Sequence, residues 1–139
     1  MIEVQALVTP TNIPQPRRVA LGCDARRLAL LIAVVTQRVG TPLADRDVFV
    51  AAAGGLHIRE PAADLALALA MLSSFGDRAI GDRTIAVGEL GLAGEVRRVP
   101  GIQRRIAETR RLGFTRALVP RGSAVSVSVS AIARESPFP

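Results

Sequence analysis

The sequence predicts an α+β domain, loosely α/β in character, in which one mixed β-sheet is packed by three helices. Short β-branched or apolar segments alternate with three longer segments whose apolar residues recur at helical spacing. Glycine and proline separate most of these segments, as is typical of turns. Because the chain shows no internal repeat and no domain boundary, we expect residues 1–139 to form a single domain around one hydrophobic core.

The N-terminal half is expected to form three strands and one helix. The strands are predicted at 2–8, 17–21 and 48–53, where β-branched and other apolar residues predominate. Asp24 is a good N-cap for a helix whose apolar residues keep helical spacing until Gly40.

The chain is organised around the turn and the helix that follow the third strand. Gly54 and Gly55 permit a sharp turn, because glycine adopts backbone angles that other residues avoid. Pro61 suits a helix start, and Asp64 adds a negative charge that the helix dipole favours there. Residues 63–72 are apolar almost all round, so this helix is expected to lie in the core.

The C-terminal half is expected to begin with a loop and to contain one more helix. The loop is predicted at 75–82, a hairpin of two strands at 84–89 and 95–99, the helix at 101–112 and a strand at 114–119. Gly113 suits the end of that helix. Val125, Val127 and Val129 alternate with serines, which predicts a half-buried edge strand.

The composition is basic and lacks the features of membrane and secreted proteins. The net charge of +6, with arginine as the residue at all 18 Lys or Arg positions, indicates an acidic partner. Nucleic acid is the leading expectation, and solvated surface arginines are the alternative. No apolar run is long enough to span a membrane, and the N-terminal residues lead us to expect no secretion signal. The single Cys23 excludes an internal disulfide and fits the cytoplasm.

Few residues suggest catalysis or metal binding. One histidine and one cysteine are too few soft ligands for a zinc site. His57 is poorly placed to activate Ser73 or Ser74, so we expect a polar surface or groove residue. The chain has no GK[ST] string and therefore no Walker-type ATP site.

Four carboxylates have structural explanations that do not require chemistry. Glu60 and Asp64 lie four residues apart, which could suggest paired carboxylates, but charges at a helix start explain them more simply. Asp45 and Asp47 precede the third strand and are expected to shape a turn rather than to bind metal.

Two blocks of sequence carry a family resemblance. GGLHIREPAADLALALAMLSS at 54–74 and GELGLAGEVRRVPGIQRRIAETRRLGFTRALVP at 88–120 closely resemble the C-terminal domain of the bacterial RadA (Sms) recombination and repair proteins. That domain is similar to the proteolytic domain of Lon. The resemblance extends from Ile2 to Pro120 and implies a Lon-like fold.

The resemblance also implies that the peptidase site is degenerate. Lon-type proteases use a Ser–Lys pair, and the matching positions here hold Ala62 and Gln103. The chain contains no lysine at all, and arginine cannot replace a base that must lose its proton. We therefore expect no catalytic residues and no enzyme activity in this domain.

By resemblance, the family joins this domain to an upstream zinc motif and a RecA-like ATPase that act as a hexameric ring on branched DNA. This chain is then expected to be an excised C-terminal domain with DNA and further copies of itself as partners. ATP, Mg and Zn are expected only in the missing modules, and no metal or cofactor is expected here. A purely structural oligomerisation domain and, less favoured, a hydrolase with an atypical dyad remain alternatives.

The arginines occur as neighbouring pairs, and eight of them are the predicted DNA contacts. These are Arg17, Arg18, Arg26 and Arg27 as the leading group, with Arg97, Arg98, Arg104 and Arg105 as a second group. Arg26 and Arg27 lie in the first turn of a predicted helix, where positive charge is mildly unfavourable, and this is a weak sign of function. Because aromatic residues are only 3% of the chain, contact with duplex phosphates is favoured over base stacking.

Overall fold

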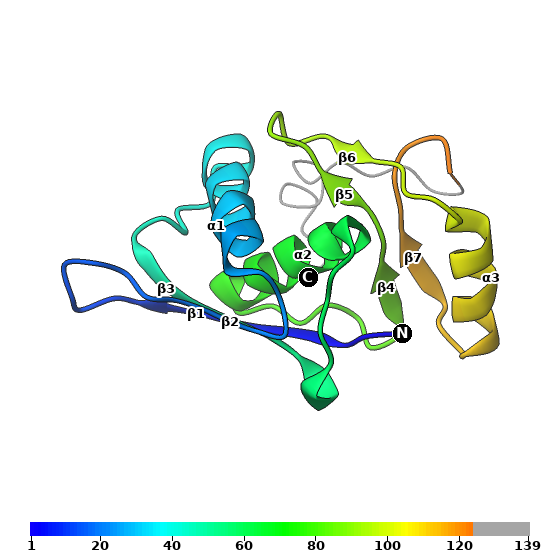
Figure 1. The fold of residues 1–139 in the computed structure, drawn as a ribbon, viewed down its shortest axis with the longest axis horizontal. Helices are drawn as coiled ribbons and strands as arrows, with labels where there is room; N and C mark the ends of the chain where they lie inside the picture. The colour runs from blue at the N-terminus through cyan, green and yellow to red at the C-terminus, as the bar shows by residue number, and fades with distance from the viewer. Residues whose placement is uncertain (124–139) are drawn as a thin grey trace.

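The computed structural model describes residues 1–123 (Figure 1). In chain order the elements are β1 (Val4–Pro10), β2 (Arg18–Leu21), α1 (Ala25–Val34), a π-helical turn (Val35–Val39), β3 (Arg46–Ala52), a 3-10 turn (Ala53–Gly55), a second 3-10 turn (Pro61–Ala63), α2 (Asp64–Gly76), β4 (Thr84–Ala86), β5 (Glu89–Leu90), β6 (Val96–Arg97), α3 (Ile102–Arg111) and β7 (Arg116–Leu118). The predicted α+β class with three helices is thus confirmed over this part of the chain. The strand predicted around Val125, Val127 and Val129 lies outside the described residues.

The three N-terminal strands form a mixed sheet in the order β1-β3-β2. β1 runs antiparallel to β3, with Val8 opposite Val48. β2 runs parallel to β3, with Val19 opposite Phe49. The connection between two parallel strands needs a crossover, and α1 supplies it.

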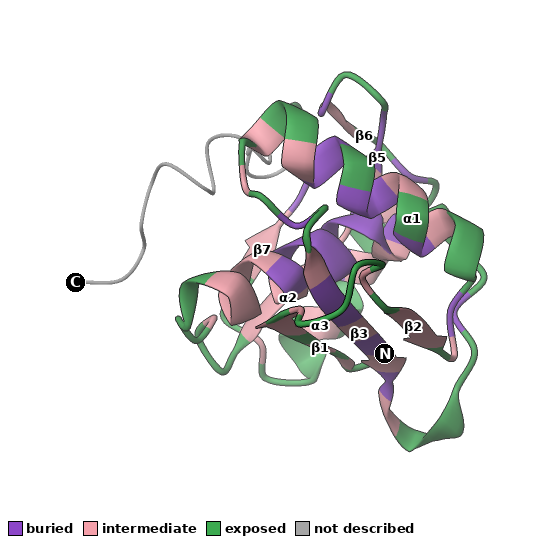
Figure 2. Cartoon of the chain, turned by 90° about the vertical axis from the view of Figure 1, so that its left-hand side faces the viewer, coloured by how far each residue is buried: buried purple, intermediate pink, exposed green. Residues whose placement is uncertain are grey.

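Helices α1 and α2 cover one face of this sheet and enclose the core (Figure 2). Asp24 caps α1 by accepting a hydrogen bond from the backbone amide of Arg27 at 2.9 Å, as the sequence predicted. The helix passes into the π-helical turn and ends at Gly40, whose φ of 80° lies in the left-handed region that glycine favours. Leu65 and Met71 of α2 are fully buried, which confirms that this helix is central.

The opposite face of the sheet is not covered by any helix among residues 1–123 (Figure 1). Leu7 on β1 and Leu21 on β2 are 55% and 62% exposed. Phe49 lies between Leu7 and Val19 in the strand register, so apolar side chains form a row across this outward face. We call the face defined by Leu7, Val19, Leu21 and Phe49 the outer sheet face.

The C-terminal half departs from the single sheet that the sequence predicted, whereas the predicted hairpin is present in a shorter form as β5 and β6. β4 pairs in parallel with β7, and β5 pairs antiparallel with β6, so the described residues form three small sheets. The segment predicted as one strand at 84–89 is interrupted at Gly88, because its amide and carbonyl bond to Ala62 and Leu65 at the start of α2. A Cβ on Gly88 would lie 2.6 Å from Cγ1 of Val96, so only glycine fits this approach.

The boundaries of the last two helices follow from their caps. α2 extends to Gly76, beyond the loop start predicted at residue 75, and Asp77 ends it in the left-handed conformation. α3 ends beside Gly113, whose φ of 88° confirms the predicted helix end.

Candidate nucleic-acid interface

Arg27 is bound to a buried carboxylate rather than free in solvent. Its Nε donates to Oδ1 of Asp64 at 2.9 Å, and its Nη2 donates to Oδ2 of the same residue. Asp64 is 1% exposed and also accepts a hydrogen bond from the amide of Leu90 at 3.0 Å. The hydrogen bond between the side chains of Arg27 and Asp64 raises the pKa of the Arg27 guanidinium. The contact explains why a cation lies in the first turn of α1, and it joins α1, α2 and β5.

Arg17 is likewise bound to a buried carboxylate, that of Asp47. Its backbone amide, Nε and Nη2 donate to the carboxylate of Asp47 at 2.7, 3.1 and 2.7 Å. Asp47 lies within β3 and is fully buried, so it binds Arg17 instead of only shaping the preceding turn. These hydrogen bonds, the side-chain bond first, lower the pKa of Asp47. The guanidinium of Arg17 also lies 5.8 Å from the ring centre of Phe49.

Arg18 anchors the turn before β3. Its guanidinium donates to the carbonyl oxygens of Arg46 and of Ala44, the latter at 2.7 Å, with a longer contact to Leu43 at 3.4 Å. Asp45 in the same turn is exposed and lies 3.9 Å from Arg46. Of the four arginines in the leading group, only Arg26 therefore has no hydrogen bond or ion pair from its guanidinium among residues 1–123.

The second group of arginines is more exposed and only partly bound within the chain. Arg97 pairs with Glu95 at 2.7 Å, and Arg105 pairs with Glu60 at 2.6 Å. Arg98 reaches the carbonyl of Arg121 at 3.4 Å. Arg104 is exposed on α3. The eight candidates are thus spread over several elements, and their role in DNA contact stays a prediction.

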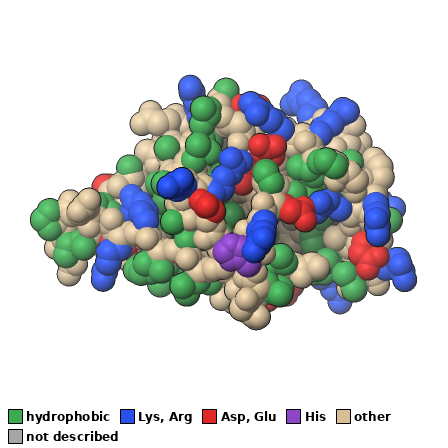
Figure 3. All heavy atoms as spheres, viewed as in Figure 1, with side chains coloured by type: hydrophobic (Ala, Val, Ile, Leu, Met, Phe, Trp, Pro, Cys, Tyr) green, Lys and Arg blue, Asp and Glu red, His purple; other side chains and the backbone are tan. Residues whose placement is uncertain are grey.

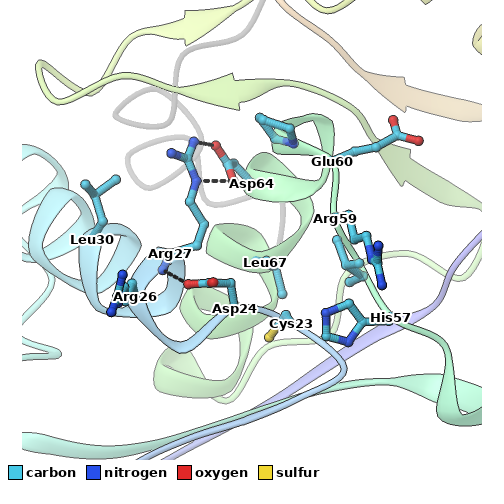
Figure 4. A pocket seen from close by; sticks show the side chains of 12 residues that line it. Cys23, Asp24, Arg26, Arg27, Leu30, His57, Arg59, Glu60, Asp64 and Leu67 are labelled. Atoms are coloured by element: carbon cyan, nitrogen blue, oxygen red, sulfur yellow. Dashed lines mark hydrogen bonds and ion pairs between the residues drawn. The ribbon is translucent and has the colours of Figure 1, made fainter.

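A pocket of about 640 Å³ lies between the start of α1, the segment before α2 and α2 itself (Figure 4). Its lining includes Arg26 and Asp24 from the α1 side and His57 and Arg59 from the opposite side. His57 is exposed at this pocket, consistent with the predicted groove residue. In the space-filling view, an arginine side chain lies against His57, and acidic side chains lie among the other arginines of the same face (Figure 3). The sequence analysis missed Arg59, because an arginine in an irregular segment carries no periodic signal.

The thiol of Cys23 lies in the wall of this pocket. Burial, and secondarily the charge of Asp24, raise the pKa of the Cys23 thiol. A reactive cysteine needs the opposite shift, since the thiolate is the nucleophile. Cys23 therefore acts as a small packing residue at the end of the core.

A larger groove, of about 1540 Å³, lies between α2, α3, β4 and the N-terminal residues. Ala62, which the sequence analysis matched to the Lon serine, is buried and lines this groove. Gln103, which it matched to the Lon lysine, is exposed on α3. Glu60 is exposed and pairs with Arg105 across the groove, whereas Asp64 points to Arg27, so these two carboxylates do not act as a pair.

Neither metal ligation nor a membrane span can be assigned from the described part of the chain. Among residues 1–123, no three His, Cys, Asp or Glu side chains lie close enough together to hold a metal ion. No helix in the same residues is long and apolar enough to cross a bilayer.

The fold and its surface define a basic α+β domain, and comparison with known proteins supplies its family. Residues 31–123 match the family model described as ChlI, subunit ChlI of Mg-chelatase, so the chain belongs to this family.

Proteins that match nearly the whole chain are named DNA repair protein RadA rather than ChlI. DNA repair protein RadA of Haemophilus influenzae is 49% identical over 123 residues, which cover 88% of this chain and 27% of the relative. RadA of Escherichia coli is 49% identical over 120 residues, covering 86% and 26%. RadA of Synechocystis sp. is 44% identical over 122 residues, covering 88% and 24%. The chain thus spans about a quarter of these relatives. The resemblance to RadA proteins is confirmed, and the likeness to Lon stays a prediction.

Proposed function

We propose that this chain is a non-proteolytic, Lon-like scaffold domain of a RadA-type DNA repair protein, and that it contacts DNA through its basic surface. The observation that carries the proposal is the identity of 44% to 49% with proteins named DNA repair protein RadA over nearly the whole chain. In the parent protein, an ATPase and a zinc motif supply the chemistry, and this domain supports ring assembly on duplex or branched DNA.

The charge of the domain supports contact with the DNA backbone. The net charge is +6, and arginine suits phosphate oxygens because its planar guanidinium can donate two parallel hydrogen bonds. Tryptophan and tyrosine are absent from the sequence, so few side chains are available for base stacking. Binding that follows phosphates rather than bases should be indifferent to sequence.

The residues at the peptidase positions support a scaffold without proteolysis. Ala62 offers a buried methyl group where a Lon-type serine would lie, and the exposed Gln103 cannot act as a base. Serine-directed probes should therefore leave the domain unlabelled, and casein should stay intact. Labelling that disappears when one serine is replaced would favour the hydrolase alternative.

A second candidate function, self-association without DNA contact, is favoured by the outer sheet face. Leu7 and Leu21 are large apolar side chains that are more than half exposed on the two strands that flank β3 in one sheet. Exposed apolar patches of this kind are typical of interaction sites. Both functions are compatible, because the pocket containing Arg26 and the outer sheet face belong to different surfaces of the domain.

The test is a fluorescence anisotropy titration of labelled duplex DNA at several salt concentrations. Neutralising about four phosphates should make the logarithm of affinity fall with the logarithm of salt concentration at a slope of roughly −3 to −4. Two duplexes of unrelated sequence should bind alike. Undetectable binding at low salt by the folded protein would reject DNA contact and leave self-association as the function.

A further inference from the structure

The small sheet formed by β4 and β7 has an open edge on the β7 side (Figure 1). In the described part of the chain, β7 pairs only with β4. The amide of Arg116 donates to the carbonyl of Arg83, which precedes β4. The carbonyl of Leu118 accepts from the amide of Val87, which follows β4. Because alternate residues of a strand direct their backbone groups to opposite edges, the amide and carbonyl of Ala117 point to the open edge.

The pair of β4 and β7 is short for a sheet that has to hold together without further strands. Each strand has three residues, and a two-stranded ribbon is only marginally stable by itself. Ala86 and Leu118 lie opposite each other in this pair and pack against the hydrophobic core. An edge with unpaired backbone groups is a template for another strand. A third strand with apolar side chains on the face of Leu118 therefore suits this edge.

The described chain ends in a turn that follows β7 directly. The amide of Ser123 donates to the carbonyl of Pro120 at 3.2 Å, and Gly122 has a φ of 80°. A hydrogen bond between the first and fourth residues and a glycine with positive φ in third place are features of a type II turn. Nε of Arg98 lies 3.4 Å from the carbonyl oxygen of Arg121, so this side chain braces the turn. Such a turn reverses the chain, which leaves Ser123 within reach of β7.

The sequence that continues from Ser123 has the pattern of a strand with one apolar face. Three valines alternate with serines at 125–129. Valine is β-branched and favours strands, and the alternation places all three valines on one face. The segment is also longer than β7, so it can cover the whole open edge.

We propose that residues 125–129 dock as an antiparallel strand on the open edge of β7, with the valines on the face of Leu118 and the serines on the face of Ala117. The docked segment supplies hydrogen-bond partners for the amide and carbonyl of Ala117. It also closes an edge that could otherwise pair with a strand of another chain. Neither DNA contact nor self-association is required for this docking.

The experiment compares two triple variants of the 139-residue protein that place the same charges on opposite faces of the segment. The first variant changes the face that packs against the sheet, and it carries Val125→Asp, Val127→Asp and Val129→Asp. The matched control changes the alternate positions, and it carries Ser126→Asp, Ser128→Asp and Ser130→Asp. If the valine variant is unfolded, the single substitution Val127→Ser replaces it.

The readout is hydrogen exchange of the Ala117 amide, followed by NMR. This amide faces the open edge, so its protection reports a strand at that edge. The amide of Leu31, a fully buried residue of α1, shows in the same spectra that the core is intact.

The Ala117 amide should exchange at least about tenfold faster in the valine variant than in the unmodified protein, with Leu31 unchanged. In the serine variant its exchange should stay within about threefold of the unmodified protein. Fast exchange of Ala117 in the unmodified protein, or an equal loss of protection in both variants, would overturn the docking. Protection of Ala117 that increases with protein concentration would overturn docking within one chain in favour of strand pairing between two copies.

Discussion

Arg27 and Asp64 form an ion pair between α1 and α2, with Nε and Oδ1 2.9 Å apart, although 37 positions separate them in the sequence. Asp64 is almost completely buried, and the side chain of Arg27 is 33% exposed. A buried carboxylate is tolerated when it is paired and hydrogen-bonded, and the amide of Leu90 adds a third donor. This pair therefore fixes α1, α2 and β5 relative to one another.

Removing the Asp64 carboxylate should destabilise the domain strongly. Asp64→Ala leaves the guanidinium of Arg27 and the amide of Leu90 without their acceptor, so we expect the free energy of unfolding to fall by about 3 kcal/mol. Glu108→Ala is the control, because its pair with Arg111 is exposed and is worth less than about 1 kcal/mol. Urea unfolding measures both changes. Equal stability losses in the two variants would contradict the structural role of Asp64.

Gly22 should tolerate no side chain. Its φ is 72°, and an added Cβ would lie 2.3 Å from the carbonyl oxygen of Leu56, which is backbone and cannot rotate away. Gly22→Ala should cost at least about 2 kcal/mol, since the left-handed conformation alone costs about 1 to 2 kcal/mol. Gly55→Ala is the matched control, because Gly55 has a φ of 69° but no atom within 4 Å of the added Cβ.

The difference between these two variants separates steric contact from backbone strain. Thermal unfolding of both variants provides the measurement. A stability loss at Gly22 no larger than that at Gly55 would show that the carbonyl of Leu56 does not pack against residue 22 in solution.

Asp47 should make the protein sensitive to acid. Its hydrogen bonds with Arg17 hold the pKa of Asp47 below its ordinary value of 3.8. A depressed pKa means that this contribution to stability is fully present above pH 3.8 and is lost as the pH falls through the lower, folded-state value. Asp47→Asn should therefore reduce stability at neutral pH and flatten the fall in stability below about pH 4.

The pH experiment needs a neighbouring control. Asp45→Asn removes a carboxylate from the turn before β3 but leaves the contact between Arg17 and Asp47 in place. Urea unfolding between pH 3 and pH 7 compares the two variants. If the Asp47→Asn variant loses as much stability in acid as the unmodified protein does, protonation of Asp47 is not the cause of that loss.

The outer sheet face should mediate self-association. Burial of a leucine side chain contributes about 1.5 to 3 kcal/mol, and a charge in its place would oppose burial. Leu7→Glu with Leu21→Glu should shift the protein toward monomer in sedimentation velocity at micromolar concentration. Leu92→Glu is the control, because Leu92 is 67% exposed but lies outside this sheet. A strict monomer before any substitution would exclude self-association of the isolated domain.

Local signals predicted the helices well because their ends depend on nearby residues. Asp24 caps α1, and Gly40 and Gly113 adopt the left-handed angles that end helical segments. The pairing of the C-terminal strands could not be predicted in the same way. β5 and β6 have two residues each, and their separation from β4 depends on contacts between Gly88 and the start of α2.

The candidate site was predicted less well because charge balance depends on tertiary contacts. Arg26 and Arg27 are adjacent and chemically identical in the sequence, yet only Arg27 reaches a buried aspartate. Arg17 meets Asp47 across 30 positions in the same way. Arg59 lines the same pocket as Arg26, from the opposite side, because the segment before α2 folds against α1. The number of arginines indicated an acidic partner. It could not distinguish the arginines that are bound to carboxylates within the chain from those that can contact a partner.

The most direct test of the account is an amide NMR titration of the 139-residue protein with duplex DNA at low salt. DNA contact through the predicted arginines predicts that chemical shifts change first near the exposed Arg26, Arg97, Arg98 and Arg104, and that added salt reverses these changes. The amides of the outer sheet face should move little. Unchanged spectra of the folded protein, or changes confined to the outer sheet face, would contradict DNA contact through this surface.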